Sequence, residues 1–170
     1  FPRFERDPFL AAPFVTRLPR ELRDGIARHG LRNSHLAAIA PAGTISVLAG
    51  GVSSGIEPIF ALEGRRGVRQ EDGTVAEVAV ACPALLAWRS SAAPGAQAPE
   101  SFVTATGIGP EAQLLMQAAL QPHVDNAISK TTNVAADLAY EDFAAIYTRA
   151  FELGLKGCTV FLPNAITGSI

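Results

Sequence analysis

The stretch APAGTIS at residues 40–46, followed by AGGVSSGIEP at 49–58, is the part of the chain around which the other segments are arranged. Glycine, serine, threonine and proline crowd this glycine-rich loop (residues 40–58), and they favour a loop with accessible backbone N–H groups over helix or strand. N–H groups that open a helix carry partial positive charge and bind anions. The loop has no lysine and no GxGxxG spacing, so it is neither a Walker P-loop nor a dinucleotide fingerprint. These residues alone leave two interpretations open, of which a structural turn is the commoner and an anion site is the other.

The segments before and after this loop predict short elements. Residues 1–15 combine aromatic side chains with prolines, which predicts irregular structure. Pro19 and Gly30 bound a short amphipathic helix. The apolar run at 36–40 predicts a buried strand that ends at the glycine-rich loop, and residues 45–48 predict a short helix after it. The loop would then lie at the carboxyl end of a strand.

A β-hairpin is predicted downstream of the loop. Residues 60–69 and 74–80 are two extended segments separated by EDGT, and Asp-Gly is a strong hairpin turn signal. Arg65, Arg66 and Arg69 lie in the first segment. An exposed hairpin with solvated arginines is favoured over a phosphate clamp, because arginine side chains are mostly solvent-exposed. Residues 84–88 then predict a helix.

The last third of the chain alternates element types. Pro110 opens a predicted helix that Pro122 ends, and residues 127–134 predict a strand. A helix over 140–153 and a strand over 157–162 complete a β-α-β unit. Parallel strands joined by a helix belong in a sheet covered on both faces. Three or four strands are too few to close a barrel, so the chain is expected to supply part of one.

Composition sets the broad class. The chain has 170 residues, 48% of them hydrophobic, and a formal charge of −2, which predicts one domain over residues 1–170. We expect no membrane insertion, no secretion and a cytoplasmic location, because long apolar runs and a signal-peptide pattern are missing. Near-neutral charge without a basic stripe argues against a nucleic-acid partner. Cys82 and Cys158 form no metal-binding pattern with the three histidines.

Four blocks of sequence carry a resemblance to a known family. RNSHLAAIAPAGTISVLAGGVSSGIEPIF at 32–60, SFVTA at 101–105, ISKTTN at 128–133 and GLKGCTVFLPNAITGS at 154–169 occur in the order found in adenosylcobalamin-dependent (class II) ribonucleotide reductases. The chain resembles the late part of that family's catalytic region over nearly its whole length. The resemblance implies an α/β fold, the C-terminal part of the ten-stranded ribonucleotide reductase barrel, with the hairpin as an excursion.

The resemblance also implies a role for the loop. The backbone N–H groups and hydroxyls of Ala42, Gly43, Thr44, Ile45 and Ser46 would bind the phosphates of a ribonucleotide substrate, which the family reduces to a deoxyribonucleotide. Adenosylcobalamin would be the cofactor, shared with a partner. No N-x-C-x-E radical-cysteine motif and no C-terminal redox cysteine pair occurs here, so an upstream catalytic half carrying that cysteine is the expected partner, and this chain contributes no catalytic residue and no metal ligand.

Departures from the family pattern keep alternatives open. Relatives usually have Thr at the position of Ala42, Arg at that of Leu162 and a bulkier residue at that of Gly64. The alternatives are a non-catalytic nucleotide-binding or regulatory module derived from the reductase barrel, or a domain excised from a longer chain. Since the first residue is Phe1, we expect residues upstream. Cys158 is expected to be a small buried thiol, and a functional thiol is the less common alternative.

Overall fold

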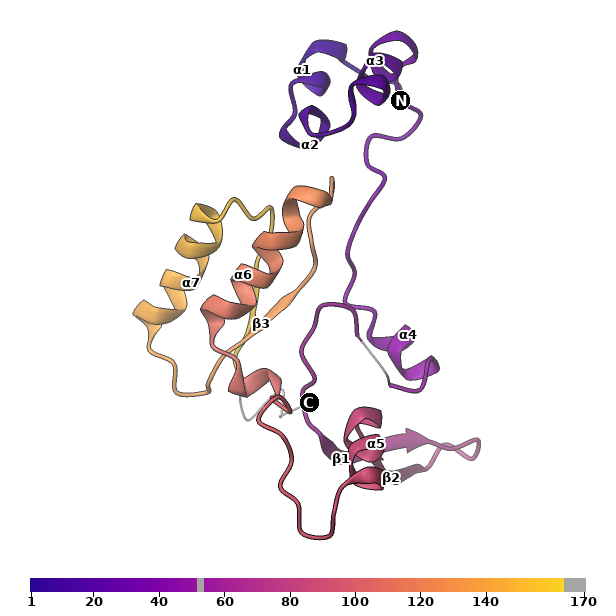
Figure 1. The fold of residues 1–170 in the computed structure, drawn as a ribbon, viewed down its shortest axis with the longest axis vertical. Coiled ribbons are helices and arrows are strands. Elements are labelled where there is room, and N and C mark those ends of the chain that lie inside the picture. Colours follow the sequence, from indigo (N-terminus) through magenta and orange to yellow (C-terminus); the bar gives the residue numbers. More distant parts are fainter. Residues whose placement is uncertain (52–53, 164–170) are drawn as a thin grey trace.

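The computed structural model describes residues 1–51 and 54–163, so Ser53 of the loop and the end of the last family block lie outside the described residues. Figure 1 shows an N-terminal helical cluster, a hairpin with one helix, and a β-α-β unit. The helices are α1 (Arg6–Leu10), α2 (Pro13–Thr16), α3 (Arg20–His29), α4 (Gly43–Leu48), α5 (Pro83–Ser91), α6 (Pro110–Leu120) and α7 (Tyr140–Glu152), with short 3-10 turns η1 (Ala105–Gly107) and η2 (Gln121–His123). The strands are β1 (Glu63–Arg69), β2 (Val75–Ala81), β3 (Thr131–Asn133) and β4 (Thr159–Phe161). Each helix within the described ranges is too short or too polar to span a bilayer.

The N-terminal residues form two short helices, so the expectation of irregular structure there is wrong. Pro8 and Pro13 lie in the first turns of α1 and α2, where an N–H group has no intrahelical partner and proline is tolerated. The rings of Phe1, Phe4 and Phe9 pack on one another with centroids 5.4–5.9 Å apart. The predicted helix α3 is confirmed, and Gly30 ends it with a positive φ of 71°.

Residues 36–40 do not form the predicted buried strand. One isolated parallel bridge joins Ile39 to Ile128, and the Ser129 N–H donates to the Ile39 carbonyl at 3.0 Å. Leu36 is largely exposed. The segment has one pairing neighbour in the part of the chain that the structure describes, which is not enough to extend a ladder. The short helix after it is confirmed as α4.

The β-hairpin is confirmed. β1 and β2 pair antiparallel from Glu63 opposite Ala81 to Arg69 opposite Val75. The turn contains Gly73, whose φ of 86° is a conformation that glycine adopts without strain. Every residue of β1 is exposed. The hairpin therefore projects from the rest of the chain, with α5 beside it (Figure 1).

The β-α-β unit is also confirmed, with shorter strands than predicted. β3 and β4 pair in parallel from Thr131 opposite Thr159 to Asn133 opposite Phe161, and α7 connects them. Helix α6 packs against β3 and α7. The core of this unit is formed by four buried side chains, those of Leu114, Val134, Ile146 and Ala150.

The described strands form two separate two-stranded sheets and no closed barrel. Helices and both kinds of strand pairing give a mixed α/β fold, in agreement with the predicted class. The ten-stranded arrangement needs strands that the described residues do not supply, so it stays a prediction.

Candidate functional site

The N-terminus of α4 lies where the glycine-rich loop turns into helix. The first intrahelical bond runs from the Ser46 N–H to the Ala42 carbonyl at 2.8 Å. The N–H groups of Gly43, Thr44 and Ile45 precede that bond, and none has a partner among the described residues. These three donors belong to residues 42–46, which the resemblance implies as a phosphate site, and they are accessible to an anion. The expectation that the Ser46 N–H also binds phosphate is wrong, because it already donates within the helix.

Ala42 holds this turn in an unusual conformation. Its φ of 54° and ψ of 22° are left-handed, which costs a non-glycine residue about 1–2 kcal/mol. It makes no side-chain cap to α4. Gly43 faces open space, because a Cβ atom built on it would meet no atom within 4 Å. The backbone at Gly43 is therefore accessible to a ligand.

A buried ion pair anchors the far end of the glycine-rich loop. Glu57 accepts the Thr131 N–H at 2.7 Å, and its other oxygen lies 3.4 Å from the Lys130 ammonium. The side chains of Lys130 and Glu57 are 1% and 14% exposed. Sequence reasoning missed this pair, although both residues lie in blocks that carry the family resemblance, SSGIEP and ISKTTN.

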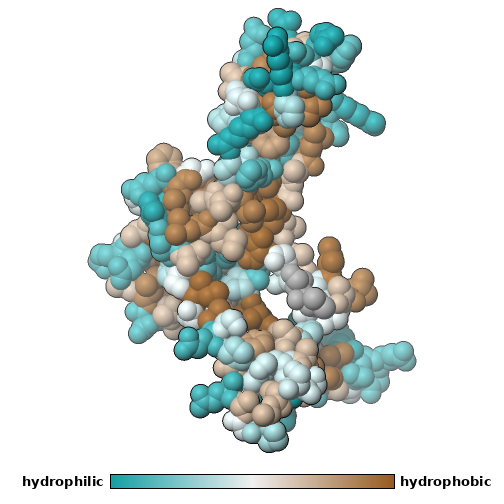
Figure 2. All heavy atoms as spheres, in the orientation of Figure 1, coloured by the Kyte–Doolittle hydropathy of each residue, from teal (hydrophilic) through white to brown (hydrophobic). Residues whose placement is uncertain are grey.

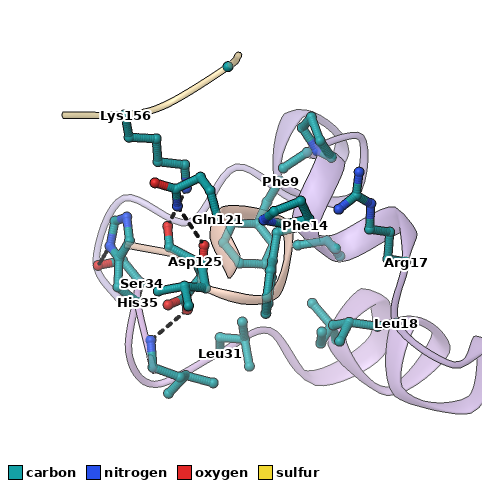
Figure 3. Close-up of a pocket in the computed structure, with 18 of the residues that line it drawn as sticks. Phe9, Phe14, Arg17, Leu18, Leu31, Ser34, His35, Gln121, Asp125 and Lys156 are labelled. Carbon is teal, nitrogen blue, oxygen red and sulfur yellow. Dashed lines mark hydrogen bonds between the residues drawn. The ribbon is translucent and has the colours of Figure 1, made fainter. Parts of the chain in front are cut away.

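A second carboxylate anchors the segment that leads into the loop (Figure 3). Asp125 accepts the Leu36 N–H at 2.6 Å and the Ala37 N–H at 2.7 Å, and Lys156 donates to the Asp125 carbonyl at 2.6 Å. Burial alone would raise the pKa of Asp125, but the two N–H groups and the charge of His35 together hold that pKa below its usual value. Asp125 is therefore ionised at neutral pH, and sequence reasoning missed it as well.

Three buried glutamines join α6 and η2 to the neighbouring backbone. Gln113, Gln117 and Gln121 are spaced four residues apart, so they lie on one helical face. Gln117 donates to the carbonyls of Ile128 and Gly157 at 3.3 and 2.8 Å. The i, i+4, i+8 spacing was the signal in the sequence that could have indicated this row.

The thiol of Cys158 lies beside this polar network and is half-buried. Burial raises its pKa, although the Thr132 hydroxyl and the Lys130 charge each lower it. The environment favours the neutral thiol, in line with the expected structural role. No group of three or more potential metal-ligating side chains occurs within residues 1–51 and 54–163.

Within residues 1–51 and 54–163, no hydrogen bond or ion pair joins the three hairpin arginines to the glycine-rich loop. Arg65 pairs with Glu77 at 2.9 Å across the hairpin, and Arg66 and Arg69 are exposed beside it. His35 contacts Ser34 at 3.1 Å and lines a cavity. Leu162 follows β4 directly.

That cavity, of about 680 Å³, lies between the N-terminal helices and η2. Figure 3 shows that the cavity lining includes the apolar side chains of Phe9, Phe14 and Leu31. The polar side chains of Asp125 and Lys156 also line it. None of the described residues of the glycine-rich loop lines it. The structure therefore separates the apolar cavity from the candidate anion site.

Comparisons with known proteins agree on one family. The family described as ribonucleotide reductase, barrel domain, matches residues 15–161. The vitamin B12-dependent ribonucleoside-diphosphate reductase of Thermoplasma acidophilum is 37% identical over an alignment 153 residues long. That alignment covers 81% of this chain and 20% of that protein. The protein of the same name from Mycobacterium tuberculosis is 33% identical over 159 residues, 82% of this chain and 22% of that protein.

A relative with a different name also matches. The ribonucleoside-diphosphate reductase subunit alpha of Mycoplasma pneumoniae is 32% identical over 164 residues, 93% of this chain and 20% of that protein. The chain thus spans about a fifth of the length of these curated relatives. Because the family match covers most of the chain, this protein belongs to the ribonucleotide reductase barrel-domain family.

Proposed function

We propose that this chain is part of the catalytic barrel of an adenosylcobalamin-dependent ribonucleotide reductase, which converts ribonucleotides to deoxyribonucleotides for DNA synthesis. Its contribution is the substrate phosphate site at Ala42, Gly43, Thr44, Ile45 and Ser46. The observation that carries this proposal is the open N-terminal turn of α4, whose N–H groups of Gly43, Thr44 and Ile45 have no partner among the described residues. All three relatives reported above are named as reductases of ribonucleoside diphosphates, and two of these names include vitamin B12 dependence.

The chemistry of the turn suits a phosphate group. Its N–H groups point out of the start of a helix, where partial positive charge collects. The hydroxyls of Thr44 and Ser46 add neutral donors, and residues 40–51 contain no lysine or arginine. The turn therefore positions a phosphate and neutralises little of its charge, so the rest of the reductase must supply counter-charge.

Adenosylcobalamin supplies a radical when it is bound. The donors beside the loop are N–H and hydroxyl groups, which suit an anion and not the largely apolar face of a corrin ring. The 680 Å³ cavity is lined by none of the loop residues that the structure describes. The described donors of the loop thus suit a phosphate, and the cobalamin contacts lie outside the loop, shared with the rest of the reductase.

The partner in this proposal is the upstream catalytic half with the radical cysteine, whether on a separate chain or on the same one. Residues 1–170 would act as a single portion of the barrel in a cytoplasmic enzyme. Side chains of α4 support such an assembly, because Ile45, Val47 and Leu48 are 68%, 51% and 89% exposed. Figure 2 shows this apolar projection beside the paler loop. Covering it and the open strand edges would need an interface larger than the ~1,600 Å² of ordinary recognition.

The first test measures turnover. The purified chain, mixed with the upstream half, adenosylcobalamin and a dithiol, should form deoxyribonucleotide, and the chain alone should form none. Turnover by the chain alone would refute the assignment as part of a larger catalytic unit. Nucleotide binding without turnover in the mixture would favour the regulatory alternative, and turnover without adenosylcobalamin would remove the cofactor from the proposal.

The second test measures binding at the loop. Gly43→Val places a side chain where the protein leaves open space, so it should exclude the phosphate without disturbing the fold. The dissociation constant for CDP in the assembled reductase should rise at least tenfold. Gly64→Val is the matched control, because a Cβ at Gly64 in β1 also meets no atom within 4 Å. Unchanged affinity in Gly43→Val would count against the site.

A further inference from the structure

The carboxylate of Glu57 reaches from the glycine-rich loop to the strand region that follows Ile128. One of its oxygens accepts the Thr131 N–H at 2.7 Å, at the first residue of β3. The other oxygen lies 3.4 Å from the Lys130 ammonium. The loop is thus fixed to β3 by both oxygens of a single side chain.

Lys130 is itself held in place from two sides. Its ammonium donates to the Thr131 carbonyl at 2.9 Å and to the Gln113 side-chain oxygen at 3.3 Å. The same Gln113 oxygen accepts the Asn133 N–H at 3.1 Å, so α6 and β3 share it. The ion pair therefore rests on the most buried part of the molecule.

Both ends of the glycine-rich loop meet at this point. Ile39 pairs with Ile128, two residues before Lys130. At the other end, Gly55 lies against the start of the loop, since a Cβ built on it would be 3.6 Å from the Ala40 carbonyl oxygen. Glu57 follows two residues later. Anchoring Glu57 therefore holds this end of the loop close to Ala40, and Ala42 opens α4 two residues beyond Ala40.

The energetics favour a positioning role over a purely stabilising one. Removing two charges from water costs about as much as their attraction returns, so a buried ion pair adds little net stability. The best-supported role of a buried ion pair is to select one register or arrangement of the chain among several. A loop rich in glycine has many arrangements to exclude, because glycine adds conformational freedom.

We infer that Glu57, through its pair with Lys130, is a positioning residue that fixes the phosphate-binding turn of α4 relative to β3. This inference rests on the proposed function, because it assumes that the turn binds the substrate phosphates. Glu57 does not touch the substrate in this account. Its loss should weaken phosphate binding and leave the chemical step unchanged.

The test uses Glu57→Gln in the assembled reductase. The amide still accepts the Thr131 N–H but loses the charge that pairs with Lys130. With CDP as substrate, we expect KM and the dissociation constant to rise about tenfold while kcat stays within twofold. Glu111→Gln is the matched control, because Glu111 pairs with Arg149 on the exposed surface, 2.8 Å away, and no hydrogen bond or ion pair joins it to the described part of the loop. That control should change neither constant.

The outcomes separate this inference from the proposed function. If Gly43→Val weakens CDP binding and a folded Glu57→Gln variant does not, the positioning role is wrong and the phosphate site stands. If neither variant changes binding, both are wrong. If Glu57→Gln fails to fold, Glu57→Asp replaces it, because the shorter carboxylate keeps the charge and shifts the loop. Glu57→Asp should raise KM about threefold at constant kcat, and an unchanged KM would overturn the inference.

Discussion

The β-hairpin and the β-α-β unit are held together by different interactions. β1 and β2 pair over seven residues each, yet every residue of β1 is exposed. β3 and β4 pair over only three residues each, but Thr132 is fully buried, and Lys130, two residues before it, is buried as well. The length of a ladder therefore does not indicate where stability lies. Burial is the better indicator, and the glycine-rich loop is anchored to the unit with the buried side chains.

The largest effect is expected where the charge is most buried. Lys130→Met leaves the Glu57 carboxylate without its partner in a poorly solvated site, so the free energy of unfolding should fall by about 3–5 kcal/mol. Urea denaturation of the folded chain measures this. Arg149→Met is the control, because Arg149 pairs with Glu111 at the surface, and its loss should have little effect. Equal losses of unfolding free energy in the two variants would show that burial of the Lys130–Glu57 pair does not raise the cost of losing one partner.

The next effect comes from the apolar core of the β-α-β unit. Leu114 is 1% exposed and Leu115 beside it is 46% exposed. Leu114→Ala should lower the free energy of unfolding by about 2–5 kcal/mol, because it leaves a cavity between α6 and α7. Leu115→Ala, which removes the same atoms from a half-exposed site, should cost much less. A similar loss in both variants would show that α6 does not present the face seen in the structure.

A smaller effect depends on pH and involves Asp125. Its native pKa is lowered, so its contribution to stability is complete above the unfolded value of about 3.9 and is lost as the pH falls through the native pKa. The melting temperature of Asp125→Asn should lie below that of the wild type at pH 6, and the gap should narrow as the pH falls below the unfolded value of about 3.9. A gap that stays constant from pH 6 to pH 2.5 would contradict the role of the carboxylate.

The smallest effect is expected in the hairpin. Arg89 on α5 donates to Glu63 on β1 at 2.8 Å, but both side chains are about half exposed. Water competes for both groups, so Arg89→Ala should leave the melting temperature of the chain unchanged within error. If Arg89→Ala lowered the melting temperature as much as Lys130→Met does, the hairpin would be held as firmly as the β-α-β unit.

Local patterns in the sequence predicted much of the fold. Asp72-Gly73 fixed the hairpin turn, and Pro110 and Gly154 bounded helices that the structure contains as α6 and α7. These signals depend on neighbours in the chain, so they can be found without tertiary information. The prediction of irregular structure for residues 1–15 is wrong because the first turn of a helix tolerates proline.

The anchors of the candidate site could not be found in the same way. Glu57 and Lys130 are 73 residues apart in the sequence and Asp125 lies 88 residues from Ala37, so only the fold brings them together. A lone glutamate or lysine reads as a solvated surface charge, because most are. The five residues 42–46 were predicted by resemblance, and the structure adds the open N-terminal turn of α4. Their role in phosphate binding stays a prediction.

The most direct measurement is a structure of the assembled reductase with CDP bound. The account predicts a phosphate oxygen within about 2.7–3.2 Å of the N–H groups of Gly43 and Thr44, with Glu57 still paired to Lys130 behind the loop. A diphosphate bound elsewhere in a fully occupied enzyme, with the first turn of α4 in contact with solvent only, would contradict it.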